Sequence, residues 1–235
     1  MIISGLQKMT LLDYPGKVAC TVFLQGCNFR CPFCHNSDLL CAQAQQVMPE
    51  ETFLSFLNKR RGLLDAVCVS GGEPTLHPDL PKLLQGIRAL GYSVKLDTNG
   101  SRPGMLAQLI GEGLVDYIAM DVKNSPDLYP ETCGLAQMDL SPVEESLRLL
   151  IGGHTPHELR TTVCQQLHDA ASMQRMGEWL ARLAKDRPIP ALYIQPFVNR
   201  DSVLTAGLSA PDENALHEFV TILRPFIQHV SLRGQ

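Results

Sequence analysis

Short apolar segments rich in β-branched residues alternate along the chain with longer segments whose apolar residues recur every three or four positions. The first pattern is typical of buried strands, and the second of amphipathic helices. Together they predict strands over residues 18–24, 66–70, 93–97, 117–122, 159–163 and 191–197. Helices are predicted over residues 50–60, 80–90, 105–112, 142–150, 170–185 and 212–226.

This alternation predicts an α/β fold with mostly parallel strands, because parallel strands need a long crossover connection that is usually helical. A complete eightfold barrel takes about 250 residues, so six strand–helix units favour an incomplete (β/α)6 TIM-like barrel. A doubly wound open sheet is the alternative. No low-complexity linker or internal repeat marks a boundary, so we expect a single domain over residues 1–235.

Polar residues and glycines follow the ends of the predicted strands. In both architectures ligands bind at the carboxyl ends of the strands, and chance would spread such residues over both ends. Their convergence therefore predicts one composite active site. In strand order they are Cys27, Cys31 and Cys34; Gly71, Gly72, Glu73 and Pro74; Asp97, Thr98, Asn99 and Gly100; Asp121 and Lys123; Arg160; and Gln195.

Composition excludes several classes of protein. The net charge is −4, with 20 Lys and Arg against 24 Asp and Glu, which argues against binding dominated by nucleic-acid phosphates. Hydrophobic residues make up 45% of the chain, enough for one sizeable core. No apolar run approaches the roughly 20 residues of a membrane helix, and the start lacks a secretory signal pattern. We expect a cytoplasmic protein without a nucleic-acid or membrane partner.

Three of the eight cysteines, Cys27, Cys31 and Cys34, lie within eight residues, which points to metal or redox chemistry. A structural zinc site usually takes four ligands, and either Cys41 or His35 could complete such a site. With only three ligands, an iron–sulfur cluster would keep one iron open to a substrate. The scattered Cys20, Cys68 and Cys164 are interpreted as buried strand residues, and Met173, Met176 and Trp179 as core.

The CNFRCPFC segment, with Phe33 before its last cysteine, and the later SGGEP segment resemble the radical S-adenosylmethionine (SAM) superfamily. The resemblance implies that Cys27, Cys31 and Cys34 bind one 4Fe–4S cluster. SAM would chelate the fourth iron through its amino and carboxylate groups. The resemblance also implies that Ser70, Gly71, Gly72 and Glu73 hold the amino group of SAM. A lone Gly-Gly pair more often marks an ordinary turn.

Other strand-end residues are expected to surround SAM. Asp97 and Asn99 lie in LDTNG, where an Asx turn is the alternative and both interpretations can hold together. Asp121 and Lys123 are two apart along the chain at a predicted strand, so we expect both side chains on the same face, toward the barrel interior. Arg160, on the next predicted strand, is expected to face the same way. Buried charges need partners. The resemblance implies that bound SAM, which is itself charged, would supply them. Phe33 completes the SAM-binding set, and no catalytic residue is predicted beyond cluster and SAM.

Two of these carboxylates raise a question of charge. Asp97 and Asp121 on neighbouring strands, together with the carboxylate of SAM, would bring three negative groups together. A cation must offset them. Lys123 is the simplest candidate, and a bound monovalent cation is a further hypothesis.

The opening segment, from KMTLLDYPGK to CHN, resembles activating enzymes of glycyl-radical proteins, most closely the anaerobic ribonucleoside-triphosphate reductase type. DTNG and MDVK are similar to segments of the pyruvate formate-lyase type, which is the alternative. The resemblance implies reductive cleavage of SAM and a 5′-deoxyadenosyl radical that abstracts hydrogen from a partner's glycine. It also implies a low-potential donor such as flavodoxin or ferredoxin.

Two other functional hypotheses remain as alternatives to an activating enzyme. A radical SAM enzyme for a small molecule, such as a deazapurine-forming enzyme, would share the cluster and the rim but not the DYPGK opening. The third reading is a non-catalytic zinc or iron–sulfur module. Roles for individual residues after Gln195 are not assigned.

Overall fold

A computed structural model describes residues 2–40 and 48–233. Its strands are neighbours in one sheet in chain order, from β1 to β8. They are β1 (Ile3–Thr10), β2 (Ala19–Leu24), β3 (Ala66–Gly71), β4 (Ser93–Thr98), β5 (Tyr117–Asp121), β6 (His157–Val163), β7 (Ala191–Pro196) and β8 (His229–Leu232). The six predicted strands are β2 to β7, each with ends within two residues of the expectation.

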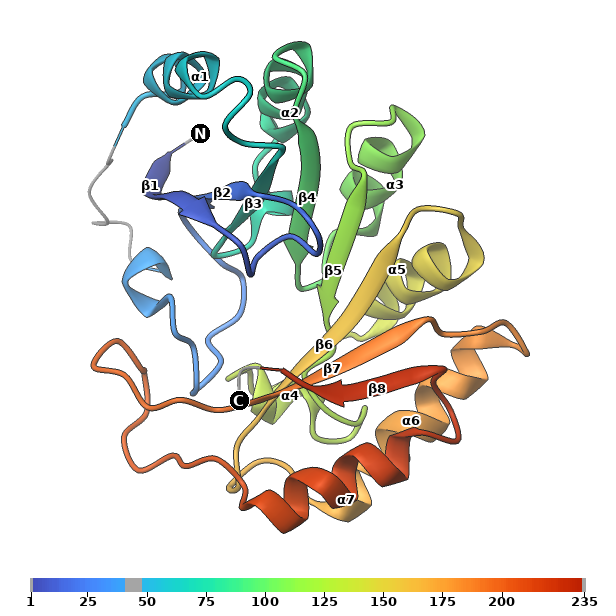
Figure 1. Cartoon of the computed structure of the whole chain (residues 1–235). Coiled ribbons are helices and arrows are strands. Elements are labelled where there is room, and N and C mark those ends of the chain that lie inside the picture. Colours follow the sequence, from blue (N-terminus) through green and yellow to red (C-terminus); the bar gives the residue numbers. More distant parts are fainter. Residues whose placement is uncertain (1, 41–47, 234–235) are drawn as a thin grey trace. The chain divides into compact units, whose positions relative to one another are not determined.

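The six predicted helices are also present (Figure 1). They are α1 (Glu50–Lys59), α2 (Leu80–Ala89), α3 (Pro103–Gly111), α5 (Ser141–Gly152), α6 (Ala170–Ala184) and α7 (Glu213–Leu223). Three short elements were not predicted: the 3-10 helices η1 (Ser37–Leu40) and η2 (Pro74–Leu76), and the single turn α4 (Tyr129–Thr132). Elements of three or four residues are too short to show a hydrophobic period.

The chain forms two compact units. Unit 1 comprises Met1–Asn28, Asn36–Thr98 and Gly104–Ala119, and unit 2 comprises Phe29–His35, Asn99–Pro103 and Met120–Gln235. The expectation of a single domain over residues 1–235 stays a prediction.

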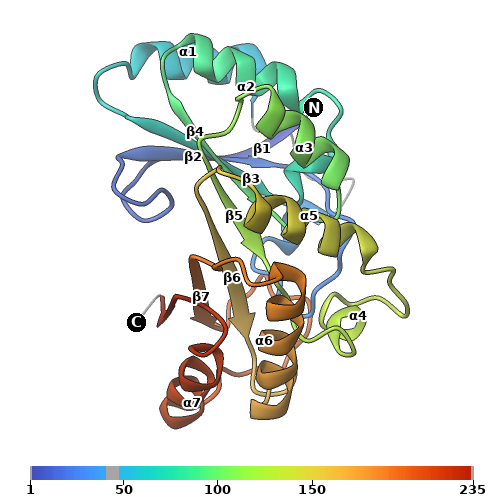
Figure 2. The same ribbon diagram turned by 90° about the vertical axis from the view of Figure 1, so that its right-hand side faces the viewer.

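In unit 1, β1 pairs with β2 in antiparallel fashion, whereas β2, β3 and β4 are parallel neighbours. The register of β2 and β3 aligns Leu24 with Gly71, so the two strands end together. Helix α2 packs against both α1 and β4 (Figure 2). Its buried stripe of Leu80, Leu83, Leu84 and Ile87 has the spacing that one helix face requires. Because β2, β3 and β4 are parallel, their carboxyl ends lie at one edge of the unit.

In unit 2, β6, β7 and β8 are parallel neighbours, and α6 packs against both α5 and α7. Helix α6 begins with a capping box, in which Asp169 accepts from the amide of Ser172 and the Ser172 hydroxyl accepts from the amide of Asp169. Met173, Met176 and Trp179 are at most 3% exposed, which confirms their prediction as core residues.

Two strand assignments differ from the expectation. Lys123 lies beyond β5, which ends at Asp121, and Cys164 lies one residue beyond β6. The apolar residues that continue each run suggested a longer strand, but the pairing ends earlier. Cys164 is still fully buried, as are Cys20 in β2 and Cys68 in β3. Burial raises the pKa of the Cys20 and Cys164 thiols to about 12, so both behave as small apolar residues.

Within residues 2–40 and 48–233, no helix has the length and apolar character needed to cross a bilayer.

Candidate active site

In unit 1, the turn after β3 is fixed to the chain that leaves β2. The amide of Gly72 donates to the carbonyl of Leu24 at 2.9 Å, and the amide of Glu73 donates to the carbonyl of Gly26 at 2.7 Å. The side-chain amide of Asn36 donates to the carbonyl of Gly71 at 3.1 Å. Gly26 directly precedes Cys27, so these bonds hold the first cysteine of the motif beside the glycine turn.

The two glycines of this turn are required by close backbone packing. A Cβ on Gly72 would lie 2.0 Å from the carbonyl oxygen of Gly26. A Cβ on Gly71 would lie 2.3 Å from the carbonyl oxygen of Leu24, and its φ of +123° is outside the range that side chains favour. Both glycines are therefore needed for the approach of two chain segments, whether or not a ligand is bound.

Glu73 is buried and engaged within the protein. It is 1% exposed, and its Oε1 accepts from the amide of Thr75 at 3.1 Å and from the hydroxyl of Thr98 at 2.7 Å. The hydroxyl of Thr75 also donates to it. The carboxylate therefore caps η2, whose first residue is Pro74, and ties that turn to the end of β4. The sequence did not indicate this role.

Asp97, on β4, has a cationic partner that the sequence interpretation missed. Lys95 Nζ lies 2.5 Å from Asp97 Oδ1, and the Lys95 side chain is only 2% exposed. The two residues are two apart on one strand, so strand alternation alone could have indicated the pair. Ser70, at the end of β3 in the same unit, is partly exposed.

In unit 2, Asp121 lies between two cations. Lys123 Nζ is 2.9 Å from its Oδ2, and the Arg160 guanidinium is 3.0 Å from its Oδ1. Lys123 was the simplest candidate to offset the charge of Asp121, and the two residues do form an ion pair, with Arg160 as a second partner. Burial alone would lower the pKa of Lys123, yet the carboxylate of Asp121 and the nearby Cys31 more than offset it and raise that pKa. The triad carries a net charge of +1.

Cys31, in the same unit, is buried. A hydrogen bond from the thiol of Cys133 is the main cause that lowers the pKa of Cys31 to about 7, against burial, which raises it. Lys123 lowers that pKa further through its charge. A cysteine with a lowered pKa is readily available as a thiolate, which is the form that binds metals. Nothing in the sequence pointed to Cys133.

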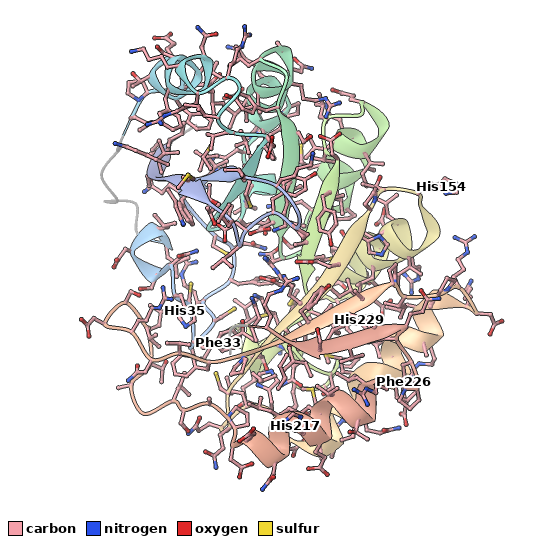
Figure 3. All side chains as sticks on the ribbon, in the orientation of Figure 1. Phe33, His35, His154, His217, Phe226 and His229 are labelled. Carbon is pink, nitrogen blue, oxygen red and sulfur yellow. The ribbon has the colours of Figure 1, made fainter. Side chains whose placement is uncertain are left out.

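Phe33 and His35 of the cysteine segment, both labelled in Figure 3, pack against other residues of unit 2. Phe33 is 4% exposed; its ring lies 6.4 Å from the His168 ring and 5.9 Å from Lys123 Nζ. His35 stacks on Phe197 at 5.7 Å, and its Nε2 lies 2.8 Å from the carbonyl oxygen of Val198. These contacts give His35 a packing role in this segment.

Asn99, also in unit 2, forms the turn that the sequence allowed as an alternative. Its Oδ1 accepts from the amide of Ser101 at 2.9 Å, and Gly100 has a φ of +73°. The Asx-turn interpretation is thus confirmed.

Of the predicted metal ligands, Cys27 belongs to unit 1, whereas Cys31 and Cys34 belong to unit 2. Over residues 2–40 and 48–233, no three His, Cys, Asp or Glu side chains are grouped to hold a metal ion. Cys41, the alternative fourth zinc ligand, lies outside the described residues. The ligand set stays a prediction from the motif.

Comparison with known proteins decides the family. The model of the radical SAM superfamily matches residues 21–163, which is more than half of the chain. The chain belongs to the radical SAM superfamily. The match includes all three cysteines of the motif, the glycine turn and the Asp121 triad.

Two curated relatives extend the comparison. The chain is 32% identical over 241 residues to "Putative glycyl-radical enzyme activating enzyme MJ1227" of Methanocaldococcus jannaschii, covering 99% of this chain and 95% of the relative. It is 30% identical over 130 residues to the pyruvate formate-lyase-activating enzyme of Clostridium pasteurianum, covering 53% of each chain.

Solved structures show the same fold. Coproporphyrinogen III oxidase from Escherichia coli, described as a radical SAM enzyme, matches with a TM-score of 0.58 and 14% identity, over 91% of this chain and 53% of that one. Family and fold together confirm the incomplete barrel over the doubly wound alternative. The protein is a radical SAM oxidoreductase, and membership implies a 4Fe–4S cluster and SAM.

The described residues fit these groups. Cys27, Cys31 and Cys34 are reduced cysteines, and Cys31 has a lowered pKa. The Gly71–Gly72 turn offers backbone without side chains, and the Asp121 triad offers net positive charge. Cysteine thiolates are the ligands that an iron–sulfur cluster requires. Exposed backbone and charged side chains are the partners that a zwitterionic nucleotide requires.

Proposed function

We propose that this protein is a radical SAM activating enzyme that generates a glycyl radical on a partner protein. The observation that carries the proposal is the similarity over 99% of the chain to a relative with that name. The DYPGK opening and the CHN closure of the cysteine segment support it, because both resemble activating enzymes. When bound, the cluster and SAM would supply a radical that removes hydrogen from a glycine Cα.

The chain's own residues would position these groups. Cys27, Cys31 and Cys34 would ligate three irons of the cluster. The backbone of Ser70, Gly71 and Gly72 would accept hydrogen bonds from the amino group of SAM, while Glu73 fixes the turn through its own hydrogen bonds. This division follows from the contacts of Glu73, whose Oε1 already accepts from Thr75 and Thr98.

The charged residues would complete the SAM site. Lys123 and Arg160 give the Asp121 triad its net positive charge, which would attract the carboxylate of SAM. Asp97, Asn99 and Phe33 are proposed as further SAM contacts. Since Lys95 and Lys123 each neutralise one carboxylate, a monovalent cation is not required by charge alone. Unchanged activity in buffers without Na⁺ and K⁺ would remove that cation from the proposal.

The partner is proposed as anaerobic ribonucleoside-triphosphate reductase, because the LLDYPGK sequence resembles the activating enzymes of that reductase. A pyruvate formate-lyase is the second candidate, because the similarity to the Clostridium pasteurianum activating enzyme covers half of the chain. The proposed electron donor is a flavodoxin or ferredoxin, since the reaction needs a potential near the low end of the range for iron–sulfur proteins.

The test is to mix the anaerobic, cluster-loaded protein with SAM, a reductant and each candidate partner in turn. The proposal predicts the electron paramagnetic resonance doublet of a glycyl radical with one partner. The doublet should be absent when Cys31→Ala replaces the wild type, and retained with Cys20→Ala. SAM cleavage without a radical on either partner would favour a small-molecule substrate.

A further inference from the structure

Cys133 lies against the cysteine segment Phe29–His35 inside unit 2. The amide of Arg30 donates to the carbonyl of Cys133 at 2.8 Å, so the residue before Cys31 is bonded to the backbone of Cys133. Both cysteines are buried, with 7% exposure for Cys31 and none for Cys133. Cys133 is therefore close to one proposed cluster ligand while belonging to a segment about one hundred residues later in the chain.

The contact is built into the backbone. Gly134 has a φ of +68°, and a Cβ at this position would lie 2.1 Å from the carbonyl oxygen of Arg30. Only glycine permits both this conformation and this approach. The segment Cys133–Gly134 and the segment around Arg30 thus pack with no space for a side chain between them.

The turn α4 presents Cys133 in a fixed position. The amide of Cys133 donates to the carbonyl of Tyr129 at 2.9 Å, and the amide of Gly134 donates to the carbonyl of Glu131 at 2.9 Å. Thr132, next to Cys133, accepts from the side-chain amide of the buried Asn124 at 3.0 Å. A side chain held by such contacts keeps its orientation with little further loss of conformational entropy.

The two cysteine side chains interact directly. The side chains of Cys133 and Cys31 form a hydrogen bond within this backbone contact. Hydrogen bonds to the sulfur ligands of an iron–sulfur cluster stabilise its reduced form, which carries one more negative charge, and so raise its reduction potential.

We propose that Cys133 is a positioning residue of the cluster: its S–H donates a hydrogen bond to the Cys31 sulfur and raises the reduction potential. This rests on the proposed function only insofar as Cys31 must ligate the cluster. The bond matters because a radical SAM cluster has to receive an electron from a soluble protein. A hydrogen bond to a ligand sulfur makes that reduction easier. Cys133 would tune the cluster without binding iron.

The test is a redox titration of the cluster, followed by electron paramagnetic resonance, in anaerobic full-length protein without SAM. Cys133→Ala removes the donor, and Cys133→Ser keeps one at nearly the same place. The expected potential of Cys133→Ala is more negative than that of the wild type, whereas that of Cys133→Ser equals or exceeds it. Cys20→Ala, which changes a buried thiol of unit 1, should leave the potential unchanged.

Iron content measured on the same samples separates the outcomes. Loss of the cluster from the alanine variant alone, with a normal serine variant, also supports the donor role. Equal potentials in wild type, alanine and serine variants would overturn the inference and leave the proposed function intact. Loss of the cluster from both variants would overturn it by making Cys133 a ligand. A wild type without a 4Fe–4S cluster would overturn both proposals.

Discussion

The amide of Glu73 donates a hydrogen bond to the carbonyl of Gly26 at 2.7 Å, which fixes the turn after β3 to the residue that precedes Cys27. Two features of the radical SAM site, the glycine turn and the first cysteine, are thereby joined through backbone alone. Such a junction depends on the absence of side chains and not on any particular one. Glycine substitution is the most direct way to disturb it.

Gly72→Ala is expected to destabilise the protein and impair cluster loading. Its Cβ would lie 2.0 Å from the carbonyl oxygen of Gly26, and forced overpacking of this kind costs about 1–3 kcal/mol. Urea unfolding followed by circular dichroism measures the change. Gly104→Ala is the matched control, because a Cβ at Gly104, in α3, meets nothing within 4 Å. Equal losses in both variants would contradict the packing role of Gly72.

Glu73→Gln separates a structural role from direct SAM binding. The carboxylate accepts from Thr75 and Thr98, and hydrogen bonds to a buried charged group are worth about 1.5–3 kcal/mol each. We expect lower stability in the absence of SAM, measured by urea unfolding. A variant with wild-type stability and only weaker SAM binding would show instead that Glu73 acts on the ligand.

Asp121→Asn is expected to lower stability by about 2 kcal/mol, because it leaves two mostly buried cations without their shared carboxylate. The fluorescence of Trp179, the single tryptophan and a residue of unit 2, can follow unfolding in urea. Asp127→Asn is the control. It breaks the exposed ion pair with Arg175, whose loss should cost no more than about 0.5 kcal/mol. Similar losses in the two variants would count against the triad as a structural unit.

The buried side chain of His168 is expected to make the folded protein less stable in mild acid. Burial lowers the pKa of His168 below its usual value of 6.5. The unfolded chain therefore takes up the proton first as pH falls, so the contribution of neutral His168 is complete above about pH 6.5 and is lost below it. The nuclear magnetic resonance shifts of the ring should report a neutral imidazole in the folded protein at pH 6. An imidazole already charged at that pH would refute the expectation.

The fold was predictable where periodicity was strong. Strands β2 to β7 are almost wholly buried or alternate clearly, and their helices carry apolar stripes, as α2 does. Strand β1 was missed because most of its residues are partly or fully exposed, which leaves no pattern of alternation. Strand β8 has only four residues, too few for any period.

The site was predictable where its residues are close in sequence. The cysteine motif and the glycine turn are short segments whose spacing is informative, and the family match includes both. The contacts of Cys133 with Arg30 and Cys31 depend on folding of segments far apart in the chain, so no local pattern could indicate them. Lys95 is different, since its spacing from Asp97 on a strand was visible in the sequence.

The most direct test of the account is anaerobic reconstitution with iron and sulfide, followed by metal analysis and a SAM cleavage assay with dithionite. A cluster held by three cysteines predicts about four irons per chain and the formation of 5′-deoxyadenosine. Both should be lost in Cys27→Ala, Cys31→Ala and Cys34→Ala and kept in Cys20→Ala. One zinc per chain with no cleavage of SAM would contradict the central claim.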